Sequence, residues 1–210
     1  MTCAVGLILS AIAVAEELKP IELPKPRTEG GMPLMEALKA RQTNRSFSPQ
    51  KLPEQVLSDL LWAACGVNRP DVGKRTAPSA MNWQEVDVYV ALADGVYLYD
   101  TKAHRLEPVL ADDLRVMTGT QGFVKDVPVN LVYVADLARM KGASDRDKVF
   151  YSAADTGFIA QNVYLYCASE GLATVVRGLV NRPALKDAFN LRPDQEVILA
   201  QSVGYPKESE

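Results

Sequence analysis

Two arginines that flank a hydroxyl and two amides form the most chemically suggestive stretch of this chain. They lie in the segment Arg41-Gln42-Thr43-Asn44-Arg45, where a predicted short helix ends. Permanently charged guanidinium groups bind a phosphate dianion through paired hydrogen bonds, and a nearby hydroxyl satisfies a further oxygen. The segment therefore suits a phosphate monoester. The alternative is that both arginines only favour the helix dipole at its carboxyl end.

A second stretch is rich in amides and turn-forming residues and leads directly into a predicted strand. It reads Pro78-Ser79-Ala80-Met81-Asn82-Trp83-Gln84. Asn and Gln side chains each offer a donor and an acceptor, so they could read the polar edge of a heterocycle. The alternative is an Asx-type turn that merely precedes a strand.

A third stretch joins a long predicted helix to a strand that ends at a glycine. It reads Gly171-Leu172-Ala173-Thr174-Val175-Val176-Arg177-Gly178. Because glycine has no side chain, a backbone N–H at its end could approach a planar ligand closely.

Taken in this order, the three stretches resemble the FMN-dependent nitroreductase family, including its smaller branch of azoline dehydrogenases, over residues 34–206. In that family an R-x-S/T-x-R segment contacts the FMN phosphate and ribityl groups. The resemblance assigns these contacts to Arg41, Gln42, Thr43 and Arg45. It also implies a homodimer with FMN at the subunit interface, and NAD(P)H as a transient electron donor.

The other two motifs complete the resemblance. A P-S-S-x-N-x-Q segment of the family is similar to Pro78, Ser79, Ala80, Asn82 and Gln84, and its first residues reach the flavin of the partner subunit. Ala80 replaces the second serine.

The family's G-L-x-x-x-x-x-G strand brings backbone N–H groups near flavin N5, which implicates Arg177 and Gly178. A basic pair often follows the last strand in the family, whereas this chain offers only Lys207 before it ends at Glu210. Phosphate binding would then depend more heavily on Arg41 and Arg45. Since the flavin carries the chemistry, we expect no catalytic side chain.

Other chemistries find little support. His104 is the single histidine, which excludes a His-rich metal site, and its polar surroundings predict an exposed side chain. Neither Gly-x-Ser-x-Gly nor a Cys and His pair is present, which argues against a hydrolase. Asp112-Asp113 and Asp145-x-Asp147 are interpreted as carboxylates at helix starts, not as metal ligands. The remaining aromatic residues of interest have helical spacing and are expected in the core or in dimer packing: Phe150, Phe158, Tyr164 and Tyr166.

Hydrophobic periodicity predicts the elements that position these stretches. We expect helices over 34–41, from Pro53 to Gly66, over 144–168 and over 181–189. We expect strands over 86–92, 96–99, 127–135, 172–176 and 196–203, with the third at the sheet centre, and a loop over 67–82. Interleaved helices and strands indicate an α+β class. The resemblance narrows this to a nitroreductase-like fold with a mixed, mainly antiparallel central sheet flanked by helices.

The first fifteen residues carry no charged side chain and end in Ala13-Val14-Ala15. This pattern predicts a cleaved signal peptide and an exported, periplasmic protein, the alternative being a buried N-terminal segment. The run is too short for a permanent membrane span, which takes about 20 apolar residues. Residues 16–33 are predicted to be an extended leader that packs little, and 34–210 the FMN-binding domain. Cys65 and Cys167 are expected in the core.

Composition bounds the possible functions. The 210 residues carry 23 Lys and Arg against 26 Asp and Glu, a net charge of -3, which argues against nucleic-acid binding. We therefore expect an FMN-dependent oxidoreductase that passes hydride through flavin N5 to or from a small organic substrate, nitroaromatic or quinone-like. The alternatives are an exported flavin-dependent dehydrogenase or oxidase that does not use NAD(P)H, and a non-catalytic flavin or ligand carrier.

Overall fold

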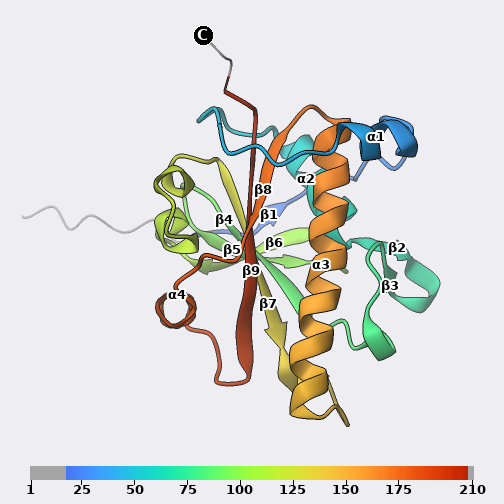
Figure 1. The fold of residues 1–210 in the computed structure, drawn as a ribbon, viewed down its shortest axis with the longest axis vertical. Helices are drawn as coiled ribbons and strands as arrows, with labels where there is room; N and C mark the ends of the chain where they lie inside the picture. The colour runs from blue at the N-terminus through green and yellow to red at the C-terminus, as the bar shows by residue number, and fades with distance from the viewer. Residues whose placement is uncertain (1–17, 208–210) are drawn as a thin grey trace, which may run out of the picture.

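A seven-stranded antiparallel sheet with helices on both faces forms the body of the protein (Figure 1). The computed structural model describes residues 18–207. The strand order is β1-β6-β5-β4-β7-β9-β8, and each pair of neighbours is antiparallel. The α+β class and the mainly antiparallel sheet are therefore confirmed. The strands are β1 (Ile21–Glu22), β4 (Val86–Ala91), β5 (Val96–Asp100), β6 (Arg105–Leu110), β7 (Val129–Asp136), β8 (Ala173–Arg177) and β9 (Gln195–Gly204).

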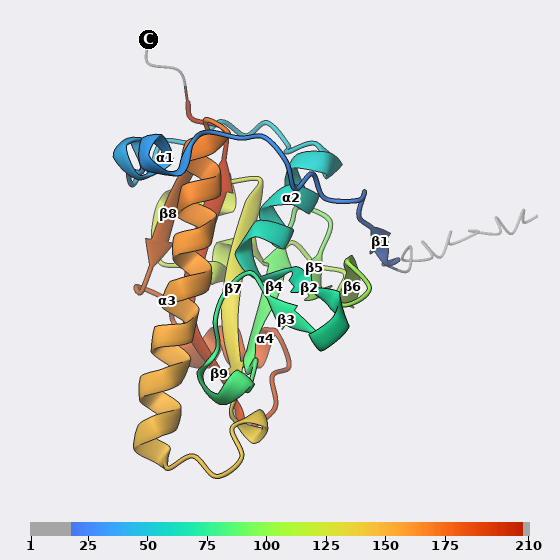
Figure 2. The ribbon, with the colours of Figure 1, turned by 90° about the vertical axis from the view of Figure 1, so that its right-hand side faces the viewer.

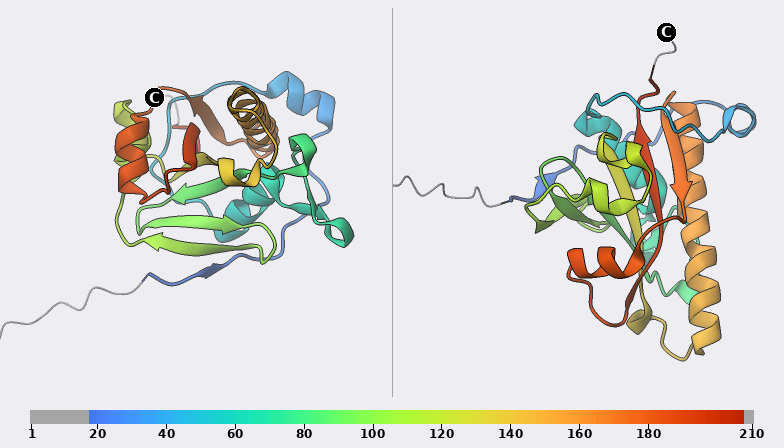
Figure 3. Two further views of the ribbon diagram at one scale, coloured as in Figure 1. Left: turned by 90° about the horizontal axis from the view of Figure 1, so that it is seen from below. Right: turned by 60° about the vertical axis from the view of Figure 1, so that its left-hand side comes forward.

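Residues 18–207 form four α-helices: α1 (Leu34–Ala40), α2 (Glu54–Cys65), α3 (Asp145–Ser169) and α4 (Arg182–Ala188). Helices α2 and α3 cover one face, and α4 with short 3-10 turns covers the other (Figure 3). Helix α3 begins as predicted, because the Ser144 hydroxyl accepts the Asp147 N–H and the Asp147 carboxylate reaches back to Ser144. All four helices lie where periodicity predicts them.

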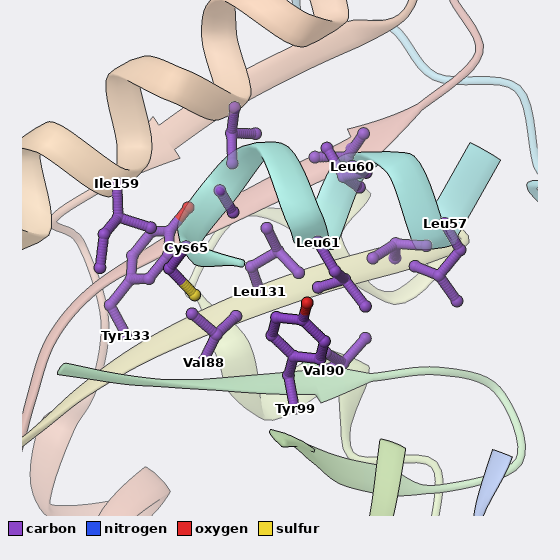
Figure 4. Close-up of a cluster of buried hydrophobic side chains, with 14 of the residues drawn as sticks. Leu57, Leu60, Leu61, Cys65, Val88, Val90, Tyr99, Leu131, Tyr133 and Ile159 are labelled. Carbon is purple, nitrogen blue, oxygen red and sulfur yellow. The ribbon is translucent and has the colours of Figure 1, made fainter. Parts of the chain in front are cut away.

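The core divides into two layers because strand side chains alternate between the faces of the sheet. In β4, Val88 and Val90 face α2 and α3, whereas Tyr89 faces α4. Figure 4 shows Leu61 of α2 packed against these strands, on the α3 side of the sheet. Strand β7, predicted to be central, has all eight residues buried and lies between β4 and β9.

The prediction of a loop over 67–82 is wrong, because this stretch contains a small two-stranded ribbon. Its strands are β2 (Val67–Arg69) and β3 (Lys74–Arg75). They are short, polar and exposed, so no apolar alternation marks them. Strand β6 also escaped prediction, since Pro108 interrupts its pattern. Strand β1 pairs with only two residues of β6, so most of β6 is a sheet edge. Proline is tolerated at such an edge.

The described part of the leader, residues 18–33, packs closely against the domain. The prediction that residues 16–33 pack little is therefore wrong for this part. It contributes β1 and the buried Leu23, then passes α2 on its way to α1 (Figure 2). Arg27 binds the buried Asp59 of α2 through its backbone N–H at 2.8 Å and its Nε at 2.7 Å. Polar bonds of this kind compensate for the small apolar area that the leader offers.

His104 also differs from prediction, since it is half-buried and holds the leader in place. Its Nε2 lies 2.7 Å from the Ser58 hydroxyl and 3.2 Å from the Pro24 carbonyl, which can only accept. Nδ1 lies 2.8 Å from the Tyr99 hydroxyl, which donates to it when the ring is neutral. Burial of the ring favours this neutral form.

The described chain adds little about the N-terminal predictions. The predicted signal peptide over residues 1–15 lies outside the described residues. Among residues 18–207, no helix combines the length and apolar character needed to cross a membrane. Cys65 and Cys167 are buried free thiols, as predicted.

The neutral His104 ring predicts a pH-dependent stability. Burial lowers the pKa of His104 below its ordinary 6.5. The folded chain then binds fewer protons than the unfolded chain, so the contribution is complete above about pH 6.5 and is lost as the pH falls through the lowered pKa. In urea unfolding from about pH 7.5 to about pH 5, His104→Asn should remove this component. An identical pH dependence in both proteins would contradict it.

Candidate functional site

The arginine segment lies along β8, the edge strand of the sheet. The Asn44 N–H donates to the Thr174 carbonyl at 3.0 Å, which ties the segment to the strand. Tyr164 of α3 makes a second tie, since its hydroxyl accepts the Val176 N–H and contacts Thr43 Oγ1, both at 3.0 Å. The Arg41 guanidinium carbon lies 5.3 Å from the centroid of the same ring. One tyrosine therefore joins the helix, the edge strand and the segment.

The C-terminal strand brings Lys207 to the same place. The Lys207 N–H donates to the Ser46 carbonyl at 3.1 Å, and Ser48 N–H donates to the Tyr205 carbonyl at 2.9 Å. Arg45 and Lys207 are both exposed, next to one another along this pairing. Arg45 and Lys207, with Arg41 four residues earlier along the segment, thus bring positive charge to this end of the chain pairing, which suits a phosphate.

Arg177 turns its side chain away from this edge. The guanidinium is buried and donates to the Thr118 carbonyl, to Thr118 Oγ1 at 3.2 Å and to Asn130 Oδ1 at 3.0 Å. Burial lowers its pKa to about 10, so it stays charged at neutral pH. Its side chain is therefore unavailable to a ligand at the open edge, and strand alternation turns its backbone N–H towards β9.

Gly178 follows at the end of β8. Backbone groups of an edge strand alternate between the neighbouring strand and the open edge, and Thr174 and Val176 direct theirs to the edge. The same alternation directs the Gly178 N–H there. A Cβ at Gly178 would meet only Leu199, at 3.8 Å, so packing within the chain does not require glycine. A ligand that approaches this backbone would.

The segment with Pro78, Ser79, Ala80 and Asn82 is not part of the same cluster within one chain. Ala80 N–H donates to Asp155 of α3 at 2.9 Å, and Asp155 precedes Tyr164 by nine residues, about 14 Å along a helix. Met81, Asn82 and Gln84 all have left-handed backbone angles, with φ of 50°, 55° and 49°. Each such residue costs on the order of 1 kcal/mol. The sequence patterns predicted neither these left-handed angles nor the strain that they impose on the turn.

The motifs named some of the site and missed other parts. Helical spacing predicts Tyr164 in core or dimer packing, but it also contacts the arginine segment. Glu85 and Asp155, which contact the turn, lie just before β4 and inside α3, where no local pattern indicates a site. Within the described residues, no cluster of His, Cys, Asp and Glu is suited to a metal ion.

The residues present fit an FMN group. Its phosphate needs cations and a hydroxyl, which Arg41, Arg45, Lys207 and Thr43 would supply. Its planar ring system needs a donor edge without side-chain bulk, which Gly178 would supply. The profile of the nitroreductase family matches residues 38–205. The chain belongs to the nitroreductase family.

Relatives agree with this assignment. A nitroreductase homologue of Methanocaldococcus jannaschii is 30% identical over 169 residues, which are 76% of this chain and 85% of that protein. A nitroreductase-family structure from Ralstonia eutropha JMP134 is 46% identical, with a TM-score of 0.88 and 98% of each chain covered. The NADPH:FMN oxidoreductase of Vibrio harveyi, complexed with NAD+, has a TM-score of 0.63 and 19% identity, over 83% of this chain and 69% of that chain. The last likeness concerns the fold alone.

The contacts of Tyr164 give a testable expectation. Tyr164→Phe keeps the ring beneath Arg41 but removes the acceptor of the Val176 N–H, and should lower the free energy of unfolding by about 1 kcal/mol. Urea unfolding measures this. Tyr151→Phe on the same helix is the matched control and should change stability less. Equal stability of Tyr164→Phe and the unmodified protein would show that the tie contributes nothing.

Proposed function

We propose that this nitroreductase-family oxidoreductase uses FMN to pass hydride to or from a small organic substrate of nitroaromatic or quinone-like character. Family membership supports an oxidoreductase in general. The observation that carries the proposal is the cluster around Tyr164, which sets a cationic segment beside the open edge of β8. Phosphate and planar ring are the two ends of FMN.

The protein's own residues bind and orient. Arg41, Arg45 and Lys207 neutralise the phosphate, and Thr43 offers a hydroxyl to the phosphate or ribityl chain. The Gly178 N–H supplies a donor to the ring edge, where it would stabilise developing negative charge. FMN, when bound, supplies two-electron chemistry at its N5 atom. NAD(P)H is the proposed transient donor.

We also propose that the working unit is a homodimer with FMN at its interface. The 78–84 turn lies about 14 Å along α3 from the Tyr164 cluster. The resemblance to the family assigns its first residues to the flavin of the partner subunit. Exposed apolar side chains gather where such an interface would need them: Met81 at the turn, and Val149, Phe150 and Phe158 on α3. A lone subunit would leave this surface in water.

A second candidate rests on the uncharged run over residues 1–15. If it directs export to the periplasm, nicotinamide donors are scarce there, and the protein would be a flavin-dependent dehydrogenase or oxidase that does not use NAD(P)H. Ala80, in place of the second serine, would weaken a flavin contact, which favours a non-catalytic flavin carrier as a third candidate.

The phosphate assignment predicts loss of FMN on removing either arginine. Arg41→Ala and Arg45→Ala each remove a charge-assisted interaction of about 1.5 to 3 kcal/mol, or roughly ten- to a hundredfold in Kd. FMN fluorescence titration measures the change. Arg146→Ala, at an exposed arginine in the first turn of α3, is the control and should bind like the unmodified protein. Full FMN content in both cluster variants would refute the assignment.

The choice of electron donor is decided by one anaerobic experiment. The FMN-loaded protein is mixed with excess NADPH, and the visible flavin absorbance is followed. Loss of the absorbance, restored by a quinone acceptor, supports the reductase. No loss with NADPH or NADH, but loss with an organic donor, supports the dehydrogenase or oxidase. If neither the nicotinamide donors nor the organic donor reduces the flavin, the result supports the non-catalytic carrier.

A further inference from the structure

The pairing between β8 and β9 stops before β9 does. Arg177, the last residue of β8, pairs with Ala200, so residues 195–199 of β9 lie beyond the end of β8 and, within residues 18–207, pair only with β7. Gly178 is the first residue after β8. Glycine has more backbone freedom than any other residue, so its N–H keeps one direction only if other groups fix the chain around it.

A β-bulge lies in this unpaired part of β9. Tyr133 of β7 pairs with Leu199 and Val134 pairs with Val197, so Ile198 has no partner in β7. An extra residue of this kind interrupts the alternation of backbone groups along a strand. As a result, the carbonyls of Val197 and Ile198, which are neighbours in the chain, both accept from the same side chain.

That side chain belongs to Arg182, the first residue of α4. Its Nε donates to the Val197 carbonyl at 3.0 Å, and its Nη2 donates to the Ile198 carbonyl at 2.7 Å. Its Nη1 donates to the Gly178 carbonyl at 3.3 Å, which also accepts the Val180 N–H at 3.0 Å. The guanidinium therefore joins the end of β8 to the bulge of β9, where the backbones of the two strands no longer pair.

The helix itself does not explain why a cation stands at position 182. A cation in the first turn of a helix faces the positive end of the helix dipole, which disfavours it. All three partners of the guanidinium are backbone carbonyls. The rigid, planar fork of arginine suits several acceptors at fixed angles, whereas a lysine ammonium is a compact charge on a flexible stem. The contacts of Arg182 thus depend on the shape of its side chain as well as on its charge.

We infer that Arg182 is a positioning residue, which fixes the backbone of Gly178 so that its N–H keeps its direction toward the open edge of β8. Gly178 is fixed from both sides, because the preceding Arg177 pairs with Ala200 and the Gly178 carbonyl is bound by Arg182. The fixing of Gly178 is a property of the single chain. Only its consequence, a correctly placed donor for flavin N5, rests on the proposed function.

The direction of the Gly178 N–H is measured by NMR relaxation in the full chain without FMN. Its order parameter should be about 0.85 in the unmodified protein, as in a rigid backbone, and below about 0.6 in Arg182→Met, which lacks all three donors. Arg182→Lys keeps the charge but not the planar fork, and Gly178 should become flexible in this variant too. Lys186→Met is the matched control, because Lys186 also joins α4 to β9, through Glu196 at 2.8 Å. Its loss should leave Gly178 rigid.

The consequence for the flavin is measured by the 15N chemical shift of N5 in labelled FMN bound to each protein. A pyridine-type nitrogen that loses a hydrogen bond resonates at higher frequency. The N5 signal should therefore move to higher frequency in Arg182→Met and Arg182→Lys, and should stay in place in Lys186→Met. A residue that only stabilised the fold would leave the N5 signal unchanged.

A rigid Gly178 N–H in both Arg182 variants would overturn the inference, and so would an N5 signal that stays in place while Gly178 becomes flexible. Normal behaviour of Arg182→Lys alone would overturn it as well, because charge and not position would then be responsible. If Arg182→Met does not fold, Arg182→Lys decides. The proposed function fails separately: if the unmodified protein binds no FMN, the order parameter still shows whether Arg182 fixes Gly178.

Discussion

An open sheet edge is the constraint on which the rest of the site depends. Among residues 18–207, strand β8 has β9 on one side and no strand on the other, so half of its backbone groups need other partners. The Asn44 N–H donates to the Thr174 carbonyl, and the Tyr164 hydroxyl accepts the Val176 N–H. The segment that carries the arginines is therefore placed by the need to cover this edge. The coverage of the β8 edge and the proposed FMN site therefore depend on the same few hydrogen bonds.

Helix α3 sets the distance between the two halves of the site. It carries Tyr164 at one level and Asp155 two and a half turns earlier, so the cationic segment and the strained turn cannot meet within one chain. The capping box at Ser144 fixes where this helix starts, and its buried face packs on α2 and the sheet. A dimer would thus turn a fixed spacing along one helix into a site with a contribution from each subunit.

Sequence patterns predicted the parts of the fold that burial controls. Helices α2 and α3 and strands β4, β7 and β9 alternate or repeat because one or both faces lie in the core. Strands β1, β2, β3 and β6 escaped prediction because their pairing, not their own pattern, makes them strands. His104 and the leader were misjudged for a similar reason, since polar side chains buried against distant carbonyls look like surface residues.

The site divides in the same way. The motifs predicted the segments 41–45, 78–84 and 171–178, since these are local in sequence. The residues that hold them were missed, because Tyr164 is 121 positions from Thr43 and Asp155 is 75 from Ala80. Such contacts leave no mark on a local pattern. Proximity in the folded chain is what reveals them.

Buried polar groups beneath both halves of the site share one physical role. Arg177 is bound by a carbonyl, a hydroxyl and an amide, none of them a carboxylate, and Glu85 lies beside a second acid. Neither arrangement is the most stable way to fill a core, since apolar side chains would avoid the cost of desolvation. A shift of the backbone bound to Arg177 or to Glu85 would break the hydrogen bonds of these buried side chains. In this protein the buried polar groups therefore determine where the β8 end and the 79–84 turn lie, and the hydrophobic core supplies the stability that makes this affordable.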